Sequence, residues 1–443
     1  MVEDALAELE SHGHEVAAAL LVGGTEKLPS TGGTYGRFTV RTGEDPTSAL
    51  DDALMELNPE AVFDLSDEPV LDYRRRHQLA AVALYRGVSY EGADFRFSPP
   101  PRPVLCTHPS VAIIGTGKRT GKTAIAGFTA RALKARGKSP VVVAMGRGGP
   151  SLPEVMRGDS LSLEPSDLVE LADSGKHAAS DYIEDALLAR VPTVGCRRCG
   201  GGLAGGVGMS NVAAGVRLAN ELGGDILILE GSGAAVPPVH ADATLLAVPA
   251  SLPLEYLEGY MGPYRMLLAD SVMVTMCEHP FGSPSQISAI TSRIRAAWQP
   301  DGKLAEDRRE VEIARSVFRP APTRSVEGAR VYVATTASEA VGVSIRSHLE
   351  GEHGCRVIGM THRLSDRARL RQELKAIRKG SADLLLCEIK AAGIDTATRW
   401  ALDEGLDVVF MDNVPIGIDG DDPDELVGSL AEVAQERWKT SQG

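Results

Sequence analysis

A short apolar run, Val111–Ile114, leads into the loop Gly115-Thr-Gly-Lys-Arg-Thr-Gly-Lys-Thr123, and a segment of helix-forming residues follows. Backbone N–H groups in such a loop and the positive end of the next helix bind phosphate. We therefore predict a nucleotide site in which Lys122 reaches the β- and γ-phosphates and Thr123 binds Mg²⁺. Five residues rather than four separate Gly115 from Gly121, so the loop is a variant. The residues expected to bind the nucleotide are Gly115, Thr116, Gly117, Thr120, Gly121, Lys122 and Thr123.

A second acidic motif supports this prediction. The apolar run Ile226–Leu229 ends in Glu230-Gly-Ser-Gly233. A carboxylate at the end of a parallel strand beside the loop would bind Mg²⁺ directly or through water, because Mg²⁺ prefers oxygen ligands. The alternative is an acid that only caps a helix or faces solvent. We favour the metal site, whose predicted ligands are Thr123 and Glu230.

Two further glycine-rich loops carry arginines. They are Met145-Gly-Arg-Gly-Gly-Pro150 and Cys196-Arg-Arg-Cys-Gly-Gly-Gly-Leu-Ala-Gly-Gly206. A guanidinium group offers a planar fork of donors that fits phosphate, and neighbouring glycines let the backbone approach closely. The alternatives are an ordinary turn for the first loop and a surface loop for the second. We predict that the arginines of these loops act in catalysis on a small polyanion, together with three cations of the first motif. The predicted catalytic residues are Lys118, Arg119, Lys122, Arg147, Arg197 and Arg198.

Cys196 and Cys199 also form a Cys-X-X-Cys pair, which would suit half of a zinc site or a redox site. No second Cys/His pair has zinc-like spacing, and the ten histidines show no metal-ligand spacing. We therefore prefer the anion-binding interpretation of this loop. Glu154, shortly after the first arginine loop, could assist the metal.

Other charged residues could line clefts at the ends of predicted strands. The run Arg74-Arg75-Arg76 lies near Asp64, Asp67 and Glu68, although a solvated helix face is the simpler interpretation. Four further residues follow strands predicted near the carboxyl end of the chain: Glu388, Lys390, Asp395 and Asp412.

Composition narrows the function further. The chain has 443 residues and a net charge of −14, with 43% hydrophobic and 24% charged residues, as in ordinary globular proteins. The negative charge argues against nucleic acid and anionic membranes as partners. Six cysteines, without a signal peptide or an apolar run of membrane-spanning length, indicate a cytoplasmic protein with reduced thiols.

The fold class predicted is α/β. Continuously apolar strands alternate with amphipathic helices, which indicates mostly parallel sheets covered on both faces. Among the predicted elements are strands over Glu15–Val22 and Ser271–Thr275 and helices over Tyr73–Tyr85, Glu255–Leu268 and, completing the last domain, Pro423–Lys439. We expect an N-terminal α/β domain at residues 1–105, a P-loop domain with a mostly parallel sheet at 106–319 and a Rossmann-like domain at 320–443. Ser98–Pro103 and Pro320–Pro322 are expected to be linkers. The chain opens on a helix, so we expect that the first strand of the N-terminal domain is missing.

The spacing from Gly115 to Lys122 and the Glu-Gly-X-Gly strand end resemble the dethiobiotin synthetase branch of P-loop proteins. Those enzymes have a single, shorter domain. The motifs around Gly115, Gly146, Cys196 and Glu230, with the early segments Gly23–Lys27 and Asp64–Pro69, are more fully similar to the cyclic 2,3-diphosphoglycerate synthetase family.

This resemblance implies an ATP-dependent ligase that joins the two phosphates of 2,3-diphosphoglycerate, with ATP and Mg²⁺ as cofactors and a homodimer as its assembly. Three alternatives stay open. One is a dethiobiotin-type ligase acting on a carboxylate or carbamate. Another is a regulatory P-loop ATPase, although Lys118 lies four residues before Lys122 rather than five. The last is a metal-delivering GTPase, for which a His/Cys-rich tract and a guanine-binding motif are absent from the sequence.

Overall fold

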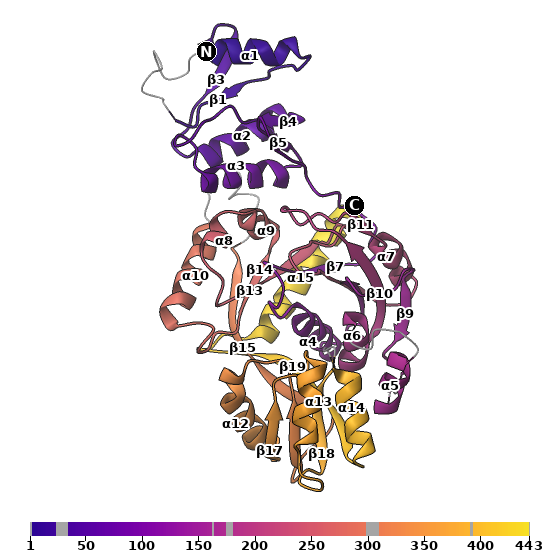
Figure 1. The fold of residues 1–443 in the computed structure, drawn as a ribbon. Coiled ribbons are helices and arrows are strands. Elements are labelled where there is room, and N and C mark those ends of the chain that lie inside the picture. Colours follow the sequence, from indigo (N-terminus) through magenta and orange to yellow (C-terminus); the bar gives the residue numbers. More distant parts are fainter. Residues whose placement is uncertain are drawn as a thin grey trace.

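The structure is a computed structural model that describes residues 2–23, 34–161, 164–173, 180–297, 310–389 and 393–442. Three regions follow one another along the chain (Figure 1): an N-terminal region, a P-loop region that contains the loop after Val111–Ile114, and a C-terminal region. The predicted α/β class is confirmed, and a large, mostly parallel sheet forms the centre of the molecule.

The N-terminal region holds two small sheets, with strand orders β1-β3-β2 and β4-β5-β6. The strand expected over Glu15–Val22 is only two residues long, whereas the helix expected over Tyr73–Tyr85 is observed with those bounds. Residues 98–109 contain no helix or strand. The elements are α1 (Val2–Ser11), β1 (Ala19–Leu20), β2 (Thr34–Tyr35), β3 (Phe38–Arg41), α2 (Pro46–Leu57), β4 (Ala61–Phe63), α3 (Tyr73–Tyr85), β5 (Ser89–Glu91) and β6 (Arg96–Phe97).

The P-loop region contributes a run of parallel strands in the order β10-β8-β12-β7-β13-β14. Its strands are β7 (Ser110–Gly115), β8 (Pro140–Gly146), β9 (Glu154–Arg157), β10 (Pro192–Cys199), β11 (Met209–Ser210), β12 (Ile226–Glu230), β13 (Ala243–Pro249) and β14 (Ser271–Thr275). Its helices are α4 (Lys122–Ala135), α5 (Pro165–Asp173), α6 (Asp181–Ala189), α7 (Val212–Asn220), α8 (Glu255–Glu258), α9 (Gly262–Leu268) and α10 (Pro284–Ala297).

Helices cover both faces of this sheet, as the continuously apolar strands predict. Ile113 of β7 packs in one core with Ile125 of α4, while the adjacent Ile114 packs in a second core with Val216 of α7 and Leu267 of α9. Successive residues of a strand point to opposite faces, so β7 is buried on both.

One predicted helix, Glu255–Leu268, is interrupted. It divides into α8 and α9 because Tyr260 and Met261 take positive φ values of 50° and 61°. This region of backbone space is unfavourable for residues with a Cβ and cannot continue a right-handed helix.

The linker predicted at Pro320–Pro322 is wrong, because these residues lie in the strand β15 (Glu312–Pro322). This long strand pairs in parallel with β14 and antiparallel with β19 (Asp407–Gly417), so one sheet continues into the C-terminal region. The remaining elements are β16 (Arg330–Ala334), the 3₁₀ helix η2 (Glu339–Val341), α12 (Gly342–Glu352), β17 (Arg356–Thr361), α13 (Arg367–Lys375), β18 (Leu384–Glu388), α14 (Ile394–Asp403) and α15 (Pro423–Gln442).

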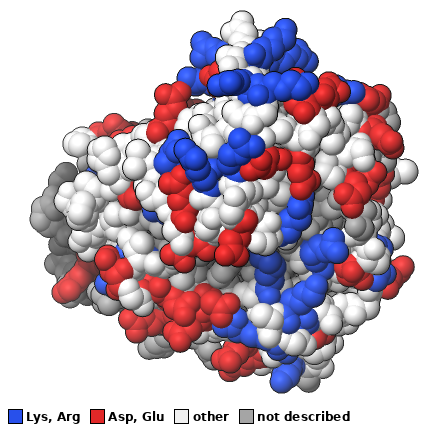
Figure 2. All heavy atoms as spheres, turned by 90° about the horizontal axis from the view of Figure 1, so that it is seen from below, with Lys and Arg blue, Asp and Glu red and all other residues white. Residues whose placement is uncertain are grey.

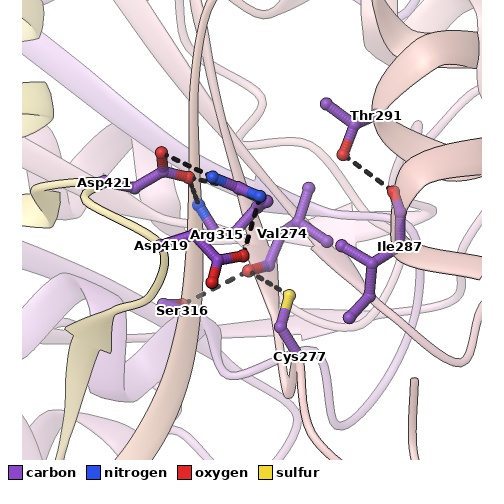
Figure 3. A network of polar contacts seen from close by, with 8 residues as sticks. All are labelled: Val274, Cys277, Ile287, Thr291, Arg315, Ser316, Asp419 and Asp421. Carbon is purple, nitrogen blue, oxygen red and sulfur yellow. Dashed lines mark hydrogen bonds and ion pairs between the residues drawn. The ribbon is translucent and has the colours of Figure 1, made fainter. Parts of the chain in front are cut away.

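Side chains reinforce this junction (Figure 3). The Arg315 guanidinium on β15 donates to Asp421 at 2.7 and 3.0 Å and to Asp419 at 3.0 Å, in the loop after β19. The hydroxyl of Ser316 donates to the carbonyl of Val274 on β14 at 3.3 Å. The strands of the two regions are thereby fixed to each other beyond their backbone pairing.

Helix α15 returns to the P-loop region. It packs on β7, β13 and α4, and its Arg437 donates to the Asp242 carbonyl at 2.9 Å. Arg136 at the end of α4 pairs with Asp424 at 2.5 Å. The helix expected to complete the C-terminal domain therefore covers the sheet that carries the P-loop.

The N-terminal region packs against the P-loop region through α3 and α9. The rings of Tyr73 and Tyr260 lie 5.6 Å apart, and Arg74 pairs with Glu258 at 3.1 Å. A Cβ on Gly259 would lie 2.8 Å from the Tyr73 ring, so this approach requires a glycine.

In the view of Figure 2, Lys and Arg gather at the top and in a run at the lower right, while Asp and Glu gather at the lower left. Among the described helices, none combines the length and the apolar character that a membrane span requires.

Candidate functional site

The P-loop connects β7 to α4 at the carboxyl edge of the sheet, where parallel sheets bind ligands. Gly121, the residue before α4, has a φ of +90°. The ammonium group of Lys122 donates to the Gly117 carbonyl at 2.7 Å and to the Thr120 hydroxyl at 3.1 Å, so it lies over the loop. Thr120 is itself held by Thr275, whose hydroxyl donates to the Thr120 carbonyl at 3.1 Å. This arrangement suits a loop that encloses phosphate groups.

The loop leaves no room for side chains at two of its glycines. A Cβ on Gly115 would lie 2.6 Å from the Thr120 hydroxyl and 3.0 Å from the Lys122 ammonium. A Cβ on Gly121 would lie 2.3 Å from the ring of Phe318, which β15 brings against the loop. The strand that continues into the C-terminal region thus also packs on the P-loop.

The predicted metal ligands lie together. Strand β12 pairs with β7, and this register brings Glu230 beside Ile113 near the start of the loop. The Thr123 hydroxyl donates to Glu230 Oε1 at 2.5 Å, and both residues are buried. A hydroxyl and a carboxylate in contact form the set of hard oxygen donors that Mg²⁺ prefers, so these residues fit that ion.

Arg198 is the most unusual charge in the site. Only 4% of it is exposed, yet no carboxylate pairs with it among the described residues. It donates instead to two carbonyls, those of Gly200 and Ser232, each at 2.7 Å, and its Nε has no partner within the described structure. Burial and the nearby charge of Arg147 lower the pKa of Arg198. A buried cation without a carboxylate is costly unless an anion binds beside it.

The other predicted cations surround this residue or lie near the same edge. A Cβ on Gly233 would lie 3.0 Å from Arg198 Nη2 and 3.8 Å from Lys118 Cγ, so the P-loop and the end of β10 approach each other there. The exposed Arg197 donates through Nε to the Gly149 carbonyl at 2.8 Å, which brings the Arg147 loop to the end of β10. Lys118, Arg119 and Arg147 are also exposed.

Asn211 joins the Arg147 loop to the end of β10, and sequence reasoning missed it. Its Oδ1 accepts from the Arg197 backbone N–H at 2.6 Å, while its Nδ2 donates to the carbonyls of Pro150 and Ser151, each at 3.1 Å. Nothing in its sequence context indicated this role. Thr275, Phe318 and the buried Arg265 of α9 were missed for the same reason.

The Cys-X-X-Cys pair and Glu154, which had competing interpretations, are placed as follows. Cys196 is buried and Cys199 is exposed on the same strand, and the described residues contain no group of three or more His, Cys, Asp or Glu side chains placed to hold a metal ion. Glu154 accepts from the Tyr182 hydroxyl at 2.9 Å and pairs with Gly195 across the sheet. A zinc or redox role for the two cysteines gains no support.

The charged clusters expected at cleft edges form ion pairs within the fold. Asp64 pairs with Arg76 at 2.7 Å and accepts from the Tyr90 hydroxyl at 3.0 Å. The Glu388 carboxylate accepts from Thr335, Thr336 and Asn413. Further ion pairs join Arg75 to Asp45, Arg131 to Asp412 and Arg367 to Asp395. Lys390 and the segment Gly24–Lys27 lie outside the described residues.

Three family models match this chain. They are the N-terminal domain of cyclic 2,3-diphosphoglycerate synthetase at residues 1–98, the P-loop domain of that enzyme at residues 110–305 and its C-terminal domain at residues 322–414.

Individual proteins agree. The chain is 41% identical to the cyclic 2,3-diphosphoglycerate synthetase of Methanothermus fervidus, covering 100% of this chain and 96% of that protein. It is 44% identical to the protein of that name from Rubrobacter xylanophilus, covering 93% and 90%. Among solved structures, LpxK from Aquifex aeolicus in complex with ATP is 12% identical and covers 86% of this chain and 99% of that one, with a TM-score of 0.43, too low to support an argument. From the family models and these relatives, this chain belongs to the cyclic 2,3-diphosphoglycerate synthetase family.

Proposed function

We propose that this chain is an ATP-dependent ligase that converts 2,3-diphosphoglycerate into cyclic 2,3-diphosphoglycerate, with ADP and phosphate as the other products. The name of its relatives supports the reaction. The observation that carries the proposal is Arg198, a buried cation with no carboxylate partner in the described structure, close to Lys118 of the P-loop. Such a cation is suited to a polyanionic substrate next to the nucleotide.

The nucleotide occupies the P-loop in this proposal. Backbone N–H groups from Gly115 to Thr123 and the Lys122 ammonium bind the ATP phosphates. Thr123 and Glu230, whose oxygens lie 2.5 Å apart, would hold Mg²⁺. When bound, this ion supplies positive charge to the β- and γ-phosphate oxygens.

Two phosphoryl steps complete the reaction. An oxygen of one substrate phosphate attacks the γ-phosphorus of ATP, the bond to the ADP oxygen breaks, and a mixed anhydride forms. An oxygen of the second substrate phosphate then attacks the phosphorus of the first. The bond to the transferred phosphoryl group breaks, phosphate leaves, and the cyclic anhydride remains. Both nucleophiles are already anions, so no general base is needed.

Bringing two phosphates together is the main electrostatic cost. Each pair of unit charges 4 Å apart repels by about 4 kcal/mol at an effective dielectric constant near 20. Cations fixed before the substrate arrives offset this repulsion without reorganising during the reaction. We assign this role to Lys118, Arg119, Arg147, Arg197 and Arg198. Holding both phosphates on one molecule also makes ring closure intramolecular, which lowers its entropic barrier.

We also propose a cytoplasmic homodimer. All six cysteines are free, which fits a reducing compartment. The exposed side chains of Leu152 and Leu203 lie on loops beside the edge strand β11, and the exposed Met209 lies in that strand; exposed apolar groups of this kind favour a protein interface. Sedimentation would test the assembly, because Met209→Asp should shift a dimer towards monomer.

Phosphorus NMR tests the reaction. Purified protein with ATP, Mg²⁺ and 2,3-diphosphoglycerate should yield new upfield anhydride signals from the substrate, together with equal amounts of ADP and phosphate. Lys122→Ala should abolish these signals, whereas Lys375→Ala, an exposed position on α13, should leave them unchanged. Hydrolysis of ATP with unchanged substrate signals would refute the proposed reaction and favour a carboxylate substrate or a regulatory ATPase.

A further inference from the structure

Arg265 on α9 is a second buried arginine without a carboxylate partner in the described structure, and it is 4% exposed. Its Nε and Nη2 donate to the Ala234 carbonyl at 3.2 and 2.6 Å, and Nη2 also donates to the Leu203 carbonyl at 3.1 Å. Its Nη1 donates to the Met261 carbonyl of its own segment at 3.1 Å. Each nitrogen of its guanidinium therefore donates to a backbone carbonyl.

The carbonyls that Arg265 binds belong to two loops at the active site. Leu203 lies in the glycine-rich loop after β10, here called the β10–β11 loop (residues 200–208), and Ala234 lies in the loop after Glu230, the β12 loop (residues 231–238). One backbone hydrogen bond, from the Val236 N–H to the Gly205 carbonyl at 2.9 Å, also joins them. Arg265 thus connects the loops from the core side.

Arg198 connects the same two loops from the site side. Its guanidinium donates to Gly200 in the β10–β11 loop and to Ser232 in the β12 loop. The two arginines differ in one respect: the Nε of Arg198 has no partner among the described residues, whereas that of Arg265 has one. Arg198 has capacity left for a ligand, and Arg265 is used within the protein.

We propose that Arg265 is a positioning residue, which holds the β10–β11 loop against the β12 loop so that Arg198 meets the substrate phosphate in the productive position. This rests on the proposed function of the site. The β10–β11 loop is rich in glycine, and such a chain loses much conformational entropy when it is fixed in one conformation. A planar guanidinium can bind two carbonyls at once, which a single ammonium group on a flexible stem does poorly.

Three variants test this role. Arg265→Lys keeps the charge but loses the fork, and Arg265→Ala leaves space for added methylguanidine. Gly205→Ala disturbs the contact between the loops without touching Arg265, because Gly205 has a φ of +83° and its Cβ would lie 2.7 Å from Val236. Arg293→Lys on α10, which pairs with Glu258 at 2.8 Å, is the matched control.

We expect Arg265→Lys and Gly205→Ala to raise the KM for 2,3-diphosphoglycerate by about 10- to 100-fold, with less than a threefold change in the KM for ATP. Chymotrypsin should cut folded Arg265→Lys faster after the exposed Leu203 of the β10–β11 loop, as mass spectrometry of the fragments would show. Methylguanidine should restore activity to Arg265→Ala, and Arg293→Lys should behave as the parent.

Equal increases in both KM values with no faster cleavage of the loop would overturn the positioning role, and so would unchanged kinetics in Arg265→Lys. The cleavage assay needs no turnover. If the parent protein formed no cyclic product, the proposed function would fail while the loop contact could still be judged by proteolysis.

Discussion

Arg198→Met should reduce activity strongly while hardly affecting stability. In the proposed reaction Arg198 supplies charge-assisted hydrogen bonds to the substrate phosphate, and losing them would cost about 1.5–3 kcal/mol. This corresponds to a decrease in kcat/KM for 2,3-diphosphoglycerate of about 10- to 150-fold. The expected effect is specific to an arginine that has no protein anion to bind.

The stability estimate follows from the contacts of the same side chain. The carbonyls of Gly200 and Ser232 each lose one donor, at about 1 kcal/mol apiece. Removing a buried charge that lies near the like charge of Arg147 stabilises the folded state by a similar amount, since apolar replacements of buried ionic groups are often neutral or stabilising. We expect the free energy of unfolding to stay within about 1 kcal/mol of the parent.

Arg86→Met is the matched control. Arg86 donates to Asp51 at 2.6 and 2.9 Å, and Asp51 is buried. Removing Arg86 leaves that carboxylate buried without its cation, which costs about 3–5 kcal/mol of stability, and kcat/KM per folded molecule should not change. Denaturant unfolding and a coupled assay for ADP release measure both quantities. Our reasoning would be refuted if Arg198→Met lost stability as Arg86→Met does and kept its kcat/KM.

Four further predictions concern the metal, the loop, the thiols and the acid range. Glu230→Gln should lower kcat by at least about 100-fold and raise the Mg²⁺ concentration needed for half-maximal rate, measured by ADP release. Gly121→Ala should abolish binding of a fluorescent ATP analogue, because the added Cβ meets Phe318 and φ is positive. Iodoacetamide at pH 8 should label Cys199 alone in the native protein, since burial raises the pKa of the other five thiols; peptide mass mapping would show any second site. The hydrogen bond from Arg330 lowers the pKa of Asp383 to about 2. The stability that ionised Asp383 contributes is therefore complete above the unfolded pKa of 3.8 and is lost as the pH falls through 2. The urea midpoint of Asp383→Asn should decline less over that pH interval than the midpoint of the parent protein.

The sequence was sufficient where local pattern and tertiary environment agree. The strand Ser271–Thr275 and the helix Tyr73–Tyr85 have the predicted bounds, because continuous apolar residues or helical periodicity leave one solution. The proximity of Thr123 and Glu230 could likewise be predicted, since the carboxyl ends of neighbouring parallel strands meet at one edge.

The role of β15 could not be predicted. Prolines at 320 and 322 indicate a linker because proline cannot donate to a sheet. Pairing between β14 and β15 ends at Arg315, so the later part of β15 is an edge strand on that side, where proline is tolerated. Whether these prolines lie beyond the pairing depends on the length of β14, which is remote from them in sequence.

The residues that support the site could not be predicted either. Asn211 and Arg265 act through backbone carbonyls of loops distant in sequence, and carbonyls leave no mark in the side-chain pattern. Arginine at 265 was compatible with any amphipathic helix. Only the folded arrangement distinguishes it from an arginine that faces water.

The position of α15 has a consequence for biosynthesis. This helix packs on β7 and α4, the strand and helix that bracket the P-loop, yet every other described element is translated before it. The ribosome synthesises the P-loop sequence early, but the apolar face that α15 covers stays exposed until residues 423–442 have been synthesised. The nucleotide site is therefore completed only after this helix has been made, and a translation product interrupted before residue 423 carries an uncovered sheet that chaperones or proteases can recognise.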